Sequence, residues 1–235
     1  MTVPLLQPLP SLASLSTTVR TTIAAFFLGA LLLAAGSGCK TRVPVIASPF
    51  ADNFERAELG ADWHDTGKSA RIKDGKFNMA KAYNHPVWLR RKLPRNVQID
   101  FDAVSMSPAG DIKVELFGDG ESFDPDKGRY DPTGYMIVFG GWNNSRSIIS
   151  RLGEHDEAVK AAYDRVGPEP LVLPGQTYHF TITRRGGALE WKLNGQRYLS
   201  WTDPEPLAGS GHEFFAINDW ETDVSFDNLS IKPVP

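Results

Sequence analysis

The sequence predicts an all-β protein, a jelly-roll β-sandwich of two antiparallel sheets. From Phe50 onward, apolar residues recur mainly with a period of two, in short segments separated by Gly, Pro, Asn and Asp. This pattern is typical of short, half-buried strands. Roughly twelve such strands without long helices fit two packed antiparallel sheets, and a double-sheet jelly roll protects its sheet edges at this size.

The first 38 residues have the organisation of a targeting signal. Arg20 precedes an apolar run over residues 23–35, and three small residues then lead to Cys39. A charged start, an apolar stretch of roughly 7–15 residues and a small-residue cleavage region are the parts of a secretory signal. The run is too short to span a bilayer comfortably, because a transmembrane helix needs roughly 20 apolar residues.

The same segment resembles a bacterial lipoprotein signal, because Cys39 is the single cysteine of the chain and directly follows the small residues. The resemblance implies that residues 1–38 are removed and that Cys39 is lipidated, so that the lipid attaches the protein to a membrane. Lys40 follows where an Asp would retain the protein at the inner membrane, which implies an outer-membrane lipoprotein of the cell envelope. An ordinary secretory signal with an incidental cysteine is the alternative, since Gly36 stands where lipoprotein signals usually have Leu.

The remaining composition limits the partners and the domain count. Removing residues 1–38 takes one positive charge, Arg20, from a chain of net charge −3 and leaves −4. Nucleic acid is therefore not expected as a partner, since a basic patch is the usual footprint for phosphate binding. Residues 39–49 contain two prolines and no periodicity and are predicted to be a tether, which leaves residues 50–235 as one β-sandwich domain.

Nine segments show the clearest strand pattern. In chain order they are residues 87–93, 97–104, 111–117, 135–140, 147–152, 177–184, 189–193, 213–218 and 224–231. Turn residues tolerant of positive φ stand between strands, as at Asp74-Gly75 and Asn194-Gly195. The runs on either side of Asn194-Gly195 predict a β-hairpin. Residues 156–165 fit a short helix and an irregular strand equally well, and both remain open.

Particular residues near both ends of the domain resemble a known superfamily. They are residues 50–54, Trp63, residues 72–75, residues 189–195 and residues 224–229. They are similar to the concanavalin A-like lectin and glucanase superfamily, and most of all to bacterial domains grouped with 3-keto-disaccharide hydrolases and laminin-G-like sugar proteins. The resemblance implies a concanavalin A-like jelly roll whose concave sheet holds carbohydrate. It also implies a structural Ca²⁺ site at Asp52 and Asp227, where oxygen ligands suit a hard cation.

Glucanases of this superfamily carry an alternating Glu-x-Asp-x-Glu stretch, which places two carboxylates on one face of a strand for retaining hydrolysis. The sequence contains no such stretch. Residues 154–157, Glu-His-Asp-Glu, have adjacent carboxylates, which an extended chain divides between two faces. The glucanase mechanism is therefore not expected.

Sugar-binding groups follow the predicted strand 135–140. Trp142, Asn143, Asn144 and Arg146 come directly after two glycines. Aromatic faces pack on the C–H surfaces of sugars, and amides and guanidinium groups pair with hydroxyls that lose water. A hairpin loop whose tryptophan caps the core is the alternative.

Two other segments contribute candidate ligand residues. By strand alternation, Trp88 and Arg90 lie on the face opposite Val87 and Leu89. Trp220 follows Asn218 and Asp219 at the end of a predicted strand. We predict that Trp88, Arg90 and Trp220 join Trp142 on or beside the concave sheet.

Glu115 and His155 are the candidates for acid–base chemistry. In residues 111–117 the alternation directs Lys113, Glu115 and Phe117 outward, so Glu115 could serve as a site acid. A salt bridge from Glu115 to an arginine of a neighbouring strand is the alternative. His155 stands beside carboxylates in a polar loop, where an imidazole can exchange protons near neutral pH.

Taken with the signal, these residues predict an exported, lipid-anchored carbohydrate-binding protein. One alternative is a hydrolase or lyase that acts on 3-keto-disaccharides, other disaccharides or polysaccharides on the same scaffold. The other is a structural envelope lipoprotein whose aromatic residues belong to the core.

Overall fold

The computed structural model describes residues 43–123 and 130–235. They belong to one compact unit that spans Thr41–Pro235. The predicted signal peptide and the predicted lipidation site, Cys39, lie outside the described residues. Within the described part of the chain, no helix is long and apolar enough to cross a membrane.

Almost all regular structure in the described residues is β-strand, which confirms the predicted fold class. The strands are β1 (Phe50–Asp52), β2 (Trp63–Asp65), β3 (Ala70–Lys73), β4 (Lys76–Ala80), β5 (Val87–Leu89), β6 (Val97–Ser105), β7 (Ile112–Gly118), β8 (Tyr135–Gly140), β9 (Arg146–Arg151), β10 (Val159–Asp164), β11 (Thr177–Arg185), β12 (Ala188–Leu193), β13 (Gln196–Thr202), β14 (Phe214–Asn218) and β15 (Asp223–Pro233). A single helical turn, α1 (Gly141–Asn144), follows β8, and a 3-10 turn, η1 (Asp156–Ala158), precedes β10.

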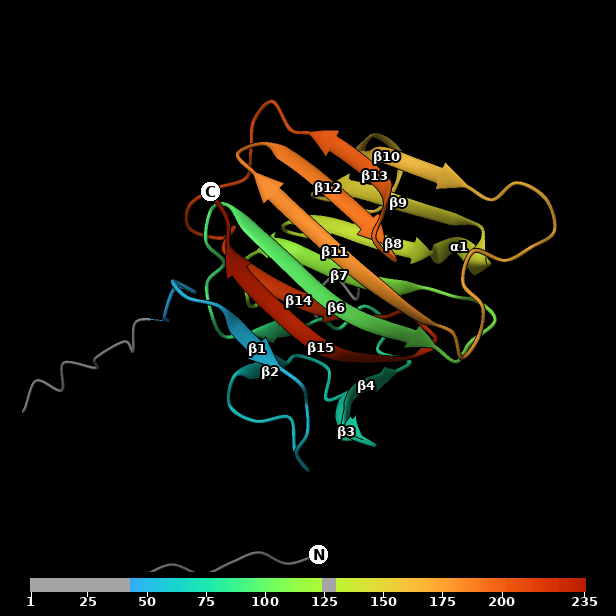
Figure 1. The fold of residues 1–235 in the computed structure, drawn as a ribbon, viewed down its shortest axis with the longest axis horizontal. Coiled ribbons are helices and arrows are strands. Elements are labelled where there is room, and N and C mark those ends of the chain that lie inside the picture. Colours follow the sequence, from blue (N-terminus) through green and yellow to red (C-terminus); the bar gives the residue numbers. More distant parts are fainter. Residues whose placement is uncertain (1–42, 124–129) are drawn as a thin grey trace, which may run out of the picture. The chain divides into compact units, whose positions relative to one another are not determined.

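The strands form two antiparallel sheets that lie one behind the other (Figure 1). The eight-stranded sheet has the order β13-β12-β11-β6-β15-β4-β3, and β1 adds to β15 at one end. The seven-stranded sheet has the order β10-β9-β8-β7-β14-β5-β2. Strands distant in sequence pair at the centre of each sheet, as β15 does with β6 and β14 with β7. This crossing connectivity is that of a jelly-roll β-sandwich.

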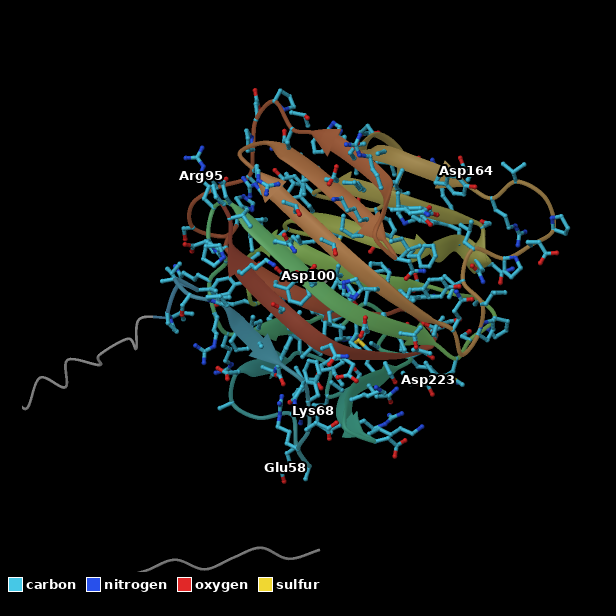
Figure 2. The ribbon with its side chains drawn as sticks, in the orientation of Figure 1. Glu58, Lys68, Arg95, Asp100, Asp164 and Asp223 are labelled. Atoms are coloured by element: carbon cyan, nitrogen blue, oxygen red, sulfur yellow. The ribbon has the colours of Figure 1, made fainter. Side chains whose placement is uncertain are left out.

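The main core fills the space between the two sheets. On β6, Ile99 and Phe101 are buried, whereas Asp100 lies on the outward face of the eight-stranded sheet (Figure 2). Phe101 stacks on Phe180 with ring centroids 4.7 Å apart, and Phe180 stacks on Trp191 at 5.6 Å. Alternation on a strand therefore separates an aromatic core from a polar surface, as the sequence pattern predicts.

Two local predictions are settled by the pairing of strands. The hairpin about Asn194-Gly195 is confirmed, because β12 and β13 pair across this turn. Residues 156–165 contain the turn η1 and then the strand β10, which pairs with β9 at the edge of the seven-stranded sheet. The strand alternative is therefore the correct one for most of this segment.

The outward position predicted for Phe117 is wrong. Phe117 has a positive φ of 59°, and the pairing of β14 with β7 shifts in register next to it. This irregularity reverses the alternation at the end of β7 and directs Phe117 into the main core, where it is 3% exposed. Bulges of this kind turn a side chain to the other face of a sheet.

The packed part of the chain begins before Phe50. Ile46 is buried, and its N–H donates a 2.9 Å hydrogen bond to the carbonyl of Lys92. Lys92 in turn donates to the carbonyl of Pro44 at 2.9 Å. The last residues of the predicted tether thus pack against the domain.

Candidate functional site

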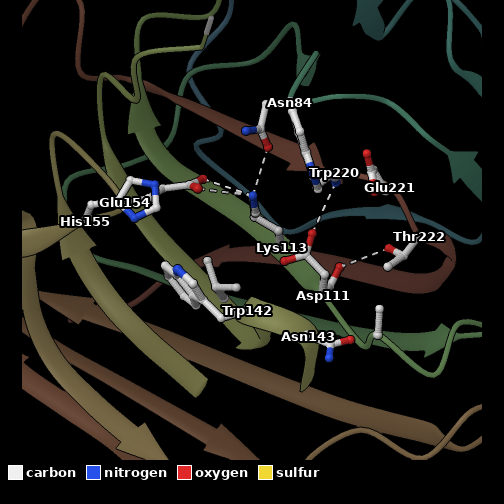
Figure 3. A pocket seen from close by; sticks show the side chains of 12 residues that line it. Asn84, Asp111, Lys113, Trp142, Asn143, Glu154, His155, Trp220, Glu221 and Thr222 are labelled. Atoms are coloured by element: carbon white, nitrogen blue, oxygen red, sulfur yellow. Dashed lines mark hydrogen bonds and ion pairs between the residues drawn. The ribbon is translucent and has the colours of Figure 1, made fainter. Parts of the chain in front are cut away.

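The outward face of the seven-stranded sheet carries a cavity of about 500 Å³ with both polar and apolar lining residues, here called the site pocket. Its strand residues, Lys113 of β7 and Val138 of β8, alternate with core residues such as Val114 and Ile137. The lining residues are Asn84, Ala109, Asp111, Lys113, Val138, Trp142, Asn143, Glu154, His155, Trp220, Glu221 and Thr222. Strands supply the floor, and loops at the strand ends supply the walls (Figure 3).

Lys113 holds two of these loops together (Figure 3). Its buried ammonium lies 3.1 Å from a carboxylate oxygen of Glu154 and donates a 2.9 Å hydrogen bond to the side-chain oxygen of Asn84. Burial disfavours the charge of Lys113, but the nearby carboxylates of Asp111, Glu154 and Asp219 outweigh this effect and raise its pKa. Lys113 therefore stays protonated and cross-links the loops that follow β4 and β9.

Asp111 presents a carboxylate to the pocket from the start of β7. One of its oxygens, Oδ2, accepts a 3.2 Å hydrogen bond from the backbone N–H of Trp220. No hydrogen bond to Oδ1 is found within the described residues. Burial raises the pKa of Asp111, Lys113 opposes the rise, and the negative charge of Glu154 adds to it. A partly exposed acceptor without a protein partner is a group that a ligand can use.

Two exposed tryptophans form opposite walls of the pocket. Trp142 is 40% exposed and Trp220 is 45% exposed. Trp142 meets the ring of His155 edge-on at 5.7 Å, and Trp220 meets the ring of Tyr83 edge-on at 5.4 Å. Lys113 lies between the two indoles in Figure 3. Exposing two large aromatic rings leaves apolar area in water, which binding of a ligand would remove.

The loops around the pocket adopt unusual backbone conformations. Tyr83, Trp142 and Leu152 have positive φ angles of 51°, 50° and 55°. Bulky residues rarely adopt this left-handed region, and such residues gather where a structure positions groups for function. The strained turns therefore support a functional assignment to this face of the sheet.

Asp219 is buried beneath the loop that carries Trp220 and holds this loop in place. Its carboxylate accepts hydrogen bonds from the backbone N–H groups of Ala82 and Thr222, at 3.3 and 3.2 Å, and from the hydroxyl of Thr222. Asp219 is fully buried, and this burial raises its pKa to about 6 although Thr222 opposes the rise. Asp219 therefore positions the loop rather than contacting a ligand.

A second hollow of about 710 Å³ adjoins the site pocket. The two share Asn84, Glu154, His155 and Trp220, so the pair Lys113–Glu154 stands near the boundary between them. The combined surface is longer than one pocket and can accept an extended ligand.

Four of the predicted site residues line the site pocket. They are Trp142, Asn143, His155 and Trp220. They come from three separate loops, and each is an aromatic, amide or imidazole side chain that the sequence places next to a strand end. The structure therefore places these four residues together.

Asn144 and Arg146 do not reach the pocket. Asn144 is 1% exposed and exchanges hydrogen bonds with the backbone of Val172, donating at 2.6 Å and accepting at 2.8 Å. Arg146 forms an ion pair with Asp164 across β9 and β10, with an N–O distance of 3.2 Å. Both residues stabilise local structure, which corrects their prediction as ligand residues.

Trp88 and Glu115 lie on the predicted face of the sheet but are fully buried there. Glu115 Oε1 accepts hydrogen bonds from the N–H and the hydroxyl of Thr133, at 2.9 and 3.2 Å. Trp88 donates a long hydrogen bond of 3.4 Å to the carbonyl of Ser122. Strand alternation gave the correct face, but it could not show that the chain after β7 returns to cover it.

Arg90 is exposed just after β5 and lines neither hollow. The structure therefore does not bring Arg90 to Trp142 and Trp220 as predicted. Neither hollow contains Trp88, its expected neighbour on the strand. The four residues predicted to form one group are thus separated. Trp88 is buried, Arg90 lies on the open surface, and Trp142 and Trp220 line the site pocket.

The predicted calcium ligands have protein partners instead. Asp52 accepts hydrogen bonds from Arg56 and from the indole N–H of Trp63, the latter at 2.9 Å. Burial raises the pKa of Asp52, but these donors outweigh burial and lower it overall. Asp227 pairs with Lys76. Among the described residues, no group of three His, Cys, Asp or Glu side chains could hold a metal ion.

Four pocket residues are not predicted from the sequence: Asn84, Asp111, Lys113 and Glu154. One signal was available: Asp111, Lys113 and Glu115 alternate, as the three acidic residues of the glucanase stretch do, but with lysine in the middle. Glu115 is fully buried and does not line the site pocket, and a lysine takes the place of the middle acid, so this strand does not supply the glucanase arrangement.

Comparison with known proteins identifies the fold. No family model matches the chain, and no curated protein matches it. Among solved structures, a carbohydrate binding module from Bacillus subtilis is similar with a TM-score of 0.57 and 11% identity, over 74% of this chain and 98% of the other. A lichenase (β-1,3-1,4-glucanase) derived from a mouse hindgut metagenome has a TM-score of 0.53 and 13% identity, over 80% and 100% of the two chains.

A Bacillus subtilis protein of unknown function with a galectin-like fold is also similar, with a TM-score of 0.57 and 13% identity over 79% of this chain and 96% of that one. This chain has a concanavalin A-like jelly-roll fold. At these low sequence identities, the similarity extends to the fold and not to the residues of the site. Since one fold hosts many functions, the function has to be argued from the pocket.

Proposed function

We propose that this concanavalin A-like protein binds carbohydrate in the site pocket. The observation that supports the proposal is the placement of two exposed indoles, Trp142 and Trp220, on opposite walls above a floor formed by Lys113 and Val138 (Figure 3). The C–H faces of a sugar ring pack on aromatic surfaces, while its hydroxyls need donors and acceptors once they lose water.

The polar residues of the pocket provide both kinds of hydrogen-bonding group. Asp111 offers its Oδ1 atom, which accepts no hydrogen bond from the part of the chain that the structure describes, and the exposed amide of Asn143 offers a donor and an acceptor. Asn84 and Lys113 are held in place by their mutual hydrogen bond, so ordering them costs little conformational entropy on binding. A pocket that is rigid before the ligand arrives favours recognition of a defined sugar.

The hydrolase or lyase alternative loses its predicted acid. Glu115 is fully buried and does not line the site pocket, so it cannot reach a ligand there in this structure. His155 lines the pocket, but a single exposed histidine beside Trp142 binds sugar as readily as it transfers protons. The binding function needs no such acid and is therefore favoured.

A glycan array followed by calorimetry with the full-length chain tests the proposal. Trp142→Ala and Trp220→Ala should each weaken binding of the selected glycan about tenfold or more, since each removes a stacking surface worth about 1.4 kcal/mol. Tyr163→Ala is the matched control, because this exposed tyrosine packs on Tyr198 away from the pocket. Unchanged affinity in both tryptophan variants, or no binding to any glycan, would contradict the proposal.

We also propose that the protein is exported and attached to the cell envelope by a lipid on Cys39. The support is the sequence alone: a short apolar run, three small residues and a single cysteine at positions 23–39. Mass spectrometry of the mature N-terminus tests this proposal. An N-terminus at Cys39 with an added acyl mass is expected, and an unmodified N-terminus elsewhere would contradict it.

A further inference from the structure

The charges of the site pocket indicate more than a general affinity for sugars. Three carboxylates line it, those of Asp111, Glu154 and Glu221, against one lysine, Lys113. Glu154 lies against the ammonium of Lys113 and covers it, and their side chains are only 13% and 4% exposed. This pair is neutral as a unit, so Asp111 and Glu221 leave the pocket with an excess of negative charge.

The excess charge lies where a ligand would be. Within residues 43–123 and 130–235, no hydrogen bond reaches Asp111 Oδ1, since the backbone N–H of Trp220 donates to the other oxygen. Glu221 is exposed at the rim beside Trp220. The indoles of Trp142 and Trp220 add surfaces that attract cations through their π faces. Each of these features favours a positive group on the ligand and disfavours a carboxylate or a sulfate.

A metal ion is a poor match for this charge. No group of three His, Cys, Asp or Glu side chains capable of holding a metal is present in the described part of the chain. The carboxylates of Asp111 and Glu154 also share the pocket with Lys113, whose ammonium occupies the space that a cation between them would need. An organic ammonium group on a sugar requires only one or two acceptors and room beside an aromatic ring.

We infer that the site pocket selects amino sugars, that is, glycans that carry a free ammonium group, over their neutral and acidic counterparts. The inference rests on the proposed carbohydrate-binding function. The ammonium donates a charge-assisted hydrogen bond to Asp111 Oδ1, within range of the field of Glu221, while the sugar ring packs between the indoles. The neutral sugar makes an ordinary hydrogen bond at the same position, and the acidic sugar meets like charge.

The test compares ligands that share a sugar ring and differ in one charged substituent. Immobilised glycans are arranged in matched series, each with a neutral hexose, the corresponding 2-amino sugar with its amine protonated, and the corresponding uronic acid. The full-length chain should bind the amino member about tenfold tighter than the neutral member, since hydrogen bonds to charged groups are about twice as strong as neutral ones. Added salt should weaken the amino member most.

Substitutions of pocket residues test whether the preference for amino sugars arises in the site pocket. Asp111→Asn and Glu221→Gln should each lower the ratio of amino to neutral affinity, and Glu221→Gln should leave the fold intact because Glu221 is exposed at the rim. Trp142→Ala should weaken every member of a series and should lower the ratio less than the two carboxylate variants do, since its indole stacks on the ring of all members. Glu205→Gln, which changes an exposed carboxylate outside both hollows, is the matched control for charge.

The outcomes separate this inference from the proposed function. Neutral or acidic members that bind as tightly as the amino member would overturn the inference, and their dependence on Trp142 would leave the carbohydrate-binding proposal standing. A preference for amino sugars that survives both carboxylate variants would also overturn it. Absence of binding in every series would overturn the inference and the proposed function together.

Discussion

Replacing Glu115 by Gln should stabilise the protein, and the gain should grow with pH. Glu115 is fully buried next to Trp88, and its Oε2 atom has no hydrogen-bond partner among the described residues. A Cβ atom at Gly118 would lie only 2.3 Å from Trp88 and 2.6 Å from Glu115 Oε1, which shows how closely the carboxyl is packed. Burial raises the pKa of Glu115 to about 8, although hydrogen bonds from Thr133 oppose the rise.

The magnitude follows from proton linkage. Between the ordinary pKa of 4.5 and about 8, folded Glu115 keeps a proton that the unfolded chain has released. The free energy of unfolding therefore falls as pH rises through this window, by about 1.4 kcal/mol per pH unit from this group alone. Over the whole window the loss reaches about 5 kcal/mol, and the non-titrating glutamine of Glu115→Gln avoids it.

Denaturant unfolding, followed by tryptophan fluorescence over a pH series, measures the effect. The difference in unfolding free energy between Glu115→Gln and the parent should be small near the lower end of the window and rise to several kcal/mol at its upper end. Glu205→Gln, at an exposed carboxylate, should track the parent throughout. Glycan affinity should stay within a few-fold, because Glu115 does not line the pocket. A difference that does not vary with pH would refute a buried, protonated Glu115.

Two further variants test buried polar side chains whose hydrogen bonds stabilise the fold. Asp203→Asn should cost about 2 kcal/mol of unfolding free energy, because the buried carboxylate accepts from the hydroxyl of Tyr135 at 2.7 Å and from Arg151 at 2.9 Å. Burial raises the pKa of Asp203 but these donors lower it overall, so the advantage of the parent over the variant should shrink as pH falls through the folded pKa, and a stability difference that stays constant into acid would contradict the assignment. Asn144→Ala should cost about 3 kcal/mol in thermal or denaturant unfolding, since it leaves the backbone of Val172 unpaired in a buried position. Unchanged stability in that variant would instead return Asn144 to the candidate ligand residues.

The arrangement of the pocket predicts that the proposed ligand affinity and the folding stability can be changed separately. The residues that would touch a ligand, Trp142 and Trp220, are exposed, whereas Asp219 and Asn144 hold their loops from buried positions. Substitution of an exposed wall residue should therefore change binding with little effect on folding. Substitution of a buried support should change both.

The sequence by itself determined the fold class. Period-two alternation and turn residues such as Asn194-Gly195 are local signals, and the β12–β13 hairpin formed where they predicted it. The aromatic and amide residues Trp142, Asn143 and Trp220 were also found from the sequence, because each stands at a strand end where a loop can present it. Local chemistry thus predicted part of the pocket wall.

Only the tertiary structure decided which polar groups form the floor and which candidates are buried. Asn84, Lys113 and Glu154 are far apart in the chain, and they meet because sheet order and loop return bring them together. Alternation assigns a side chain to one of two faces, but it carries no information on what later covers that face. Glu115 was placed on the correct face and is nevertheless buried, because long-range packing, not strand periodicity, determines its exposure.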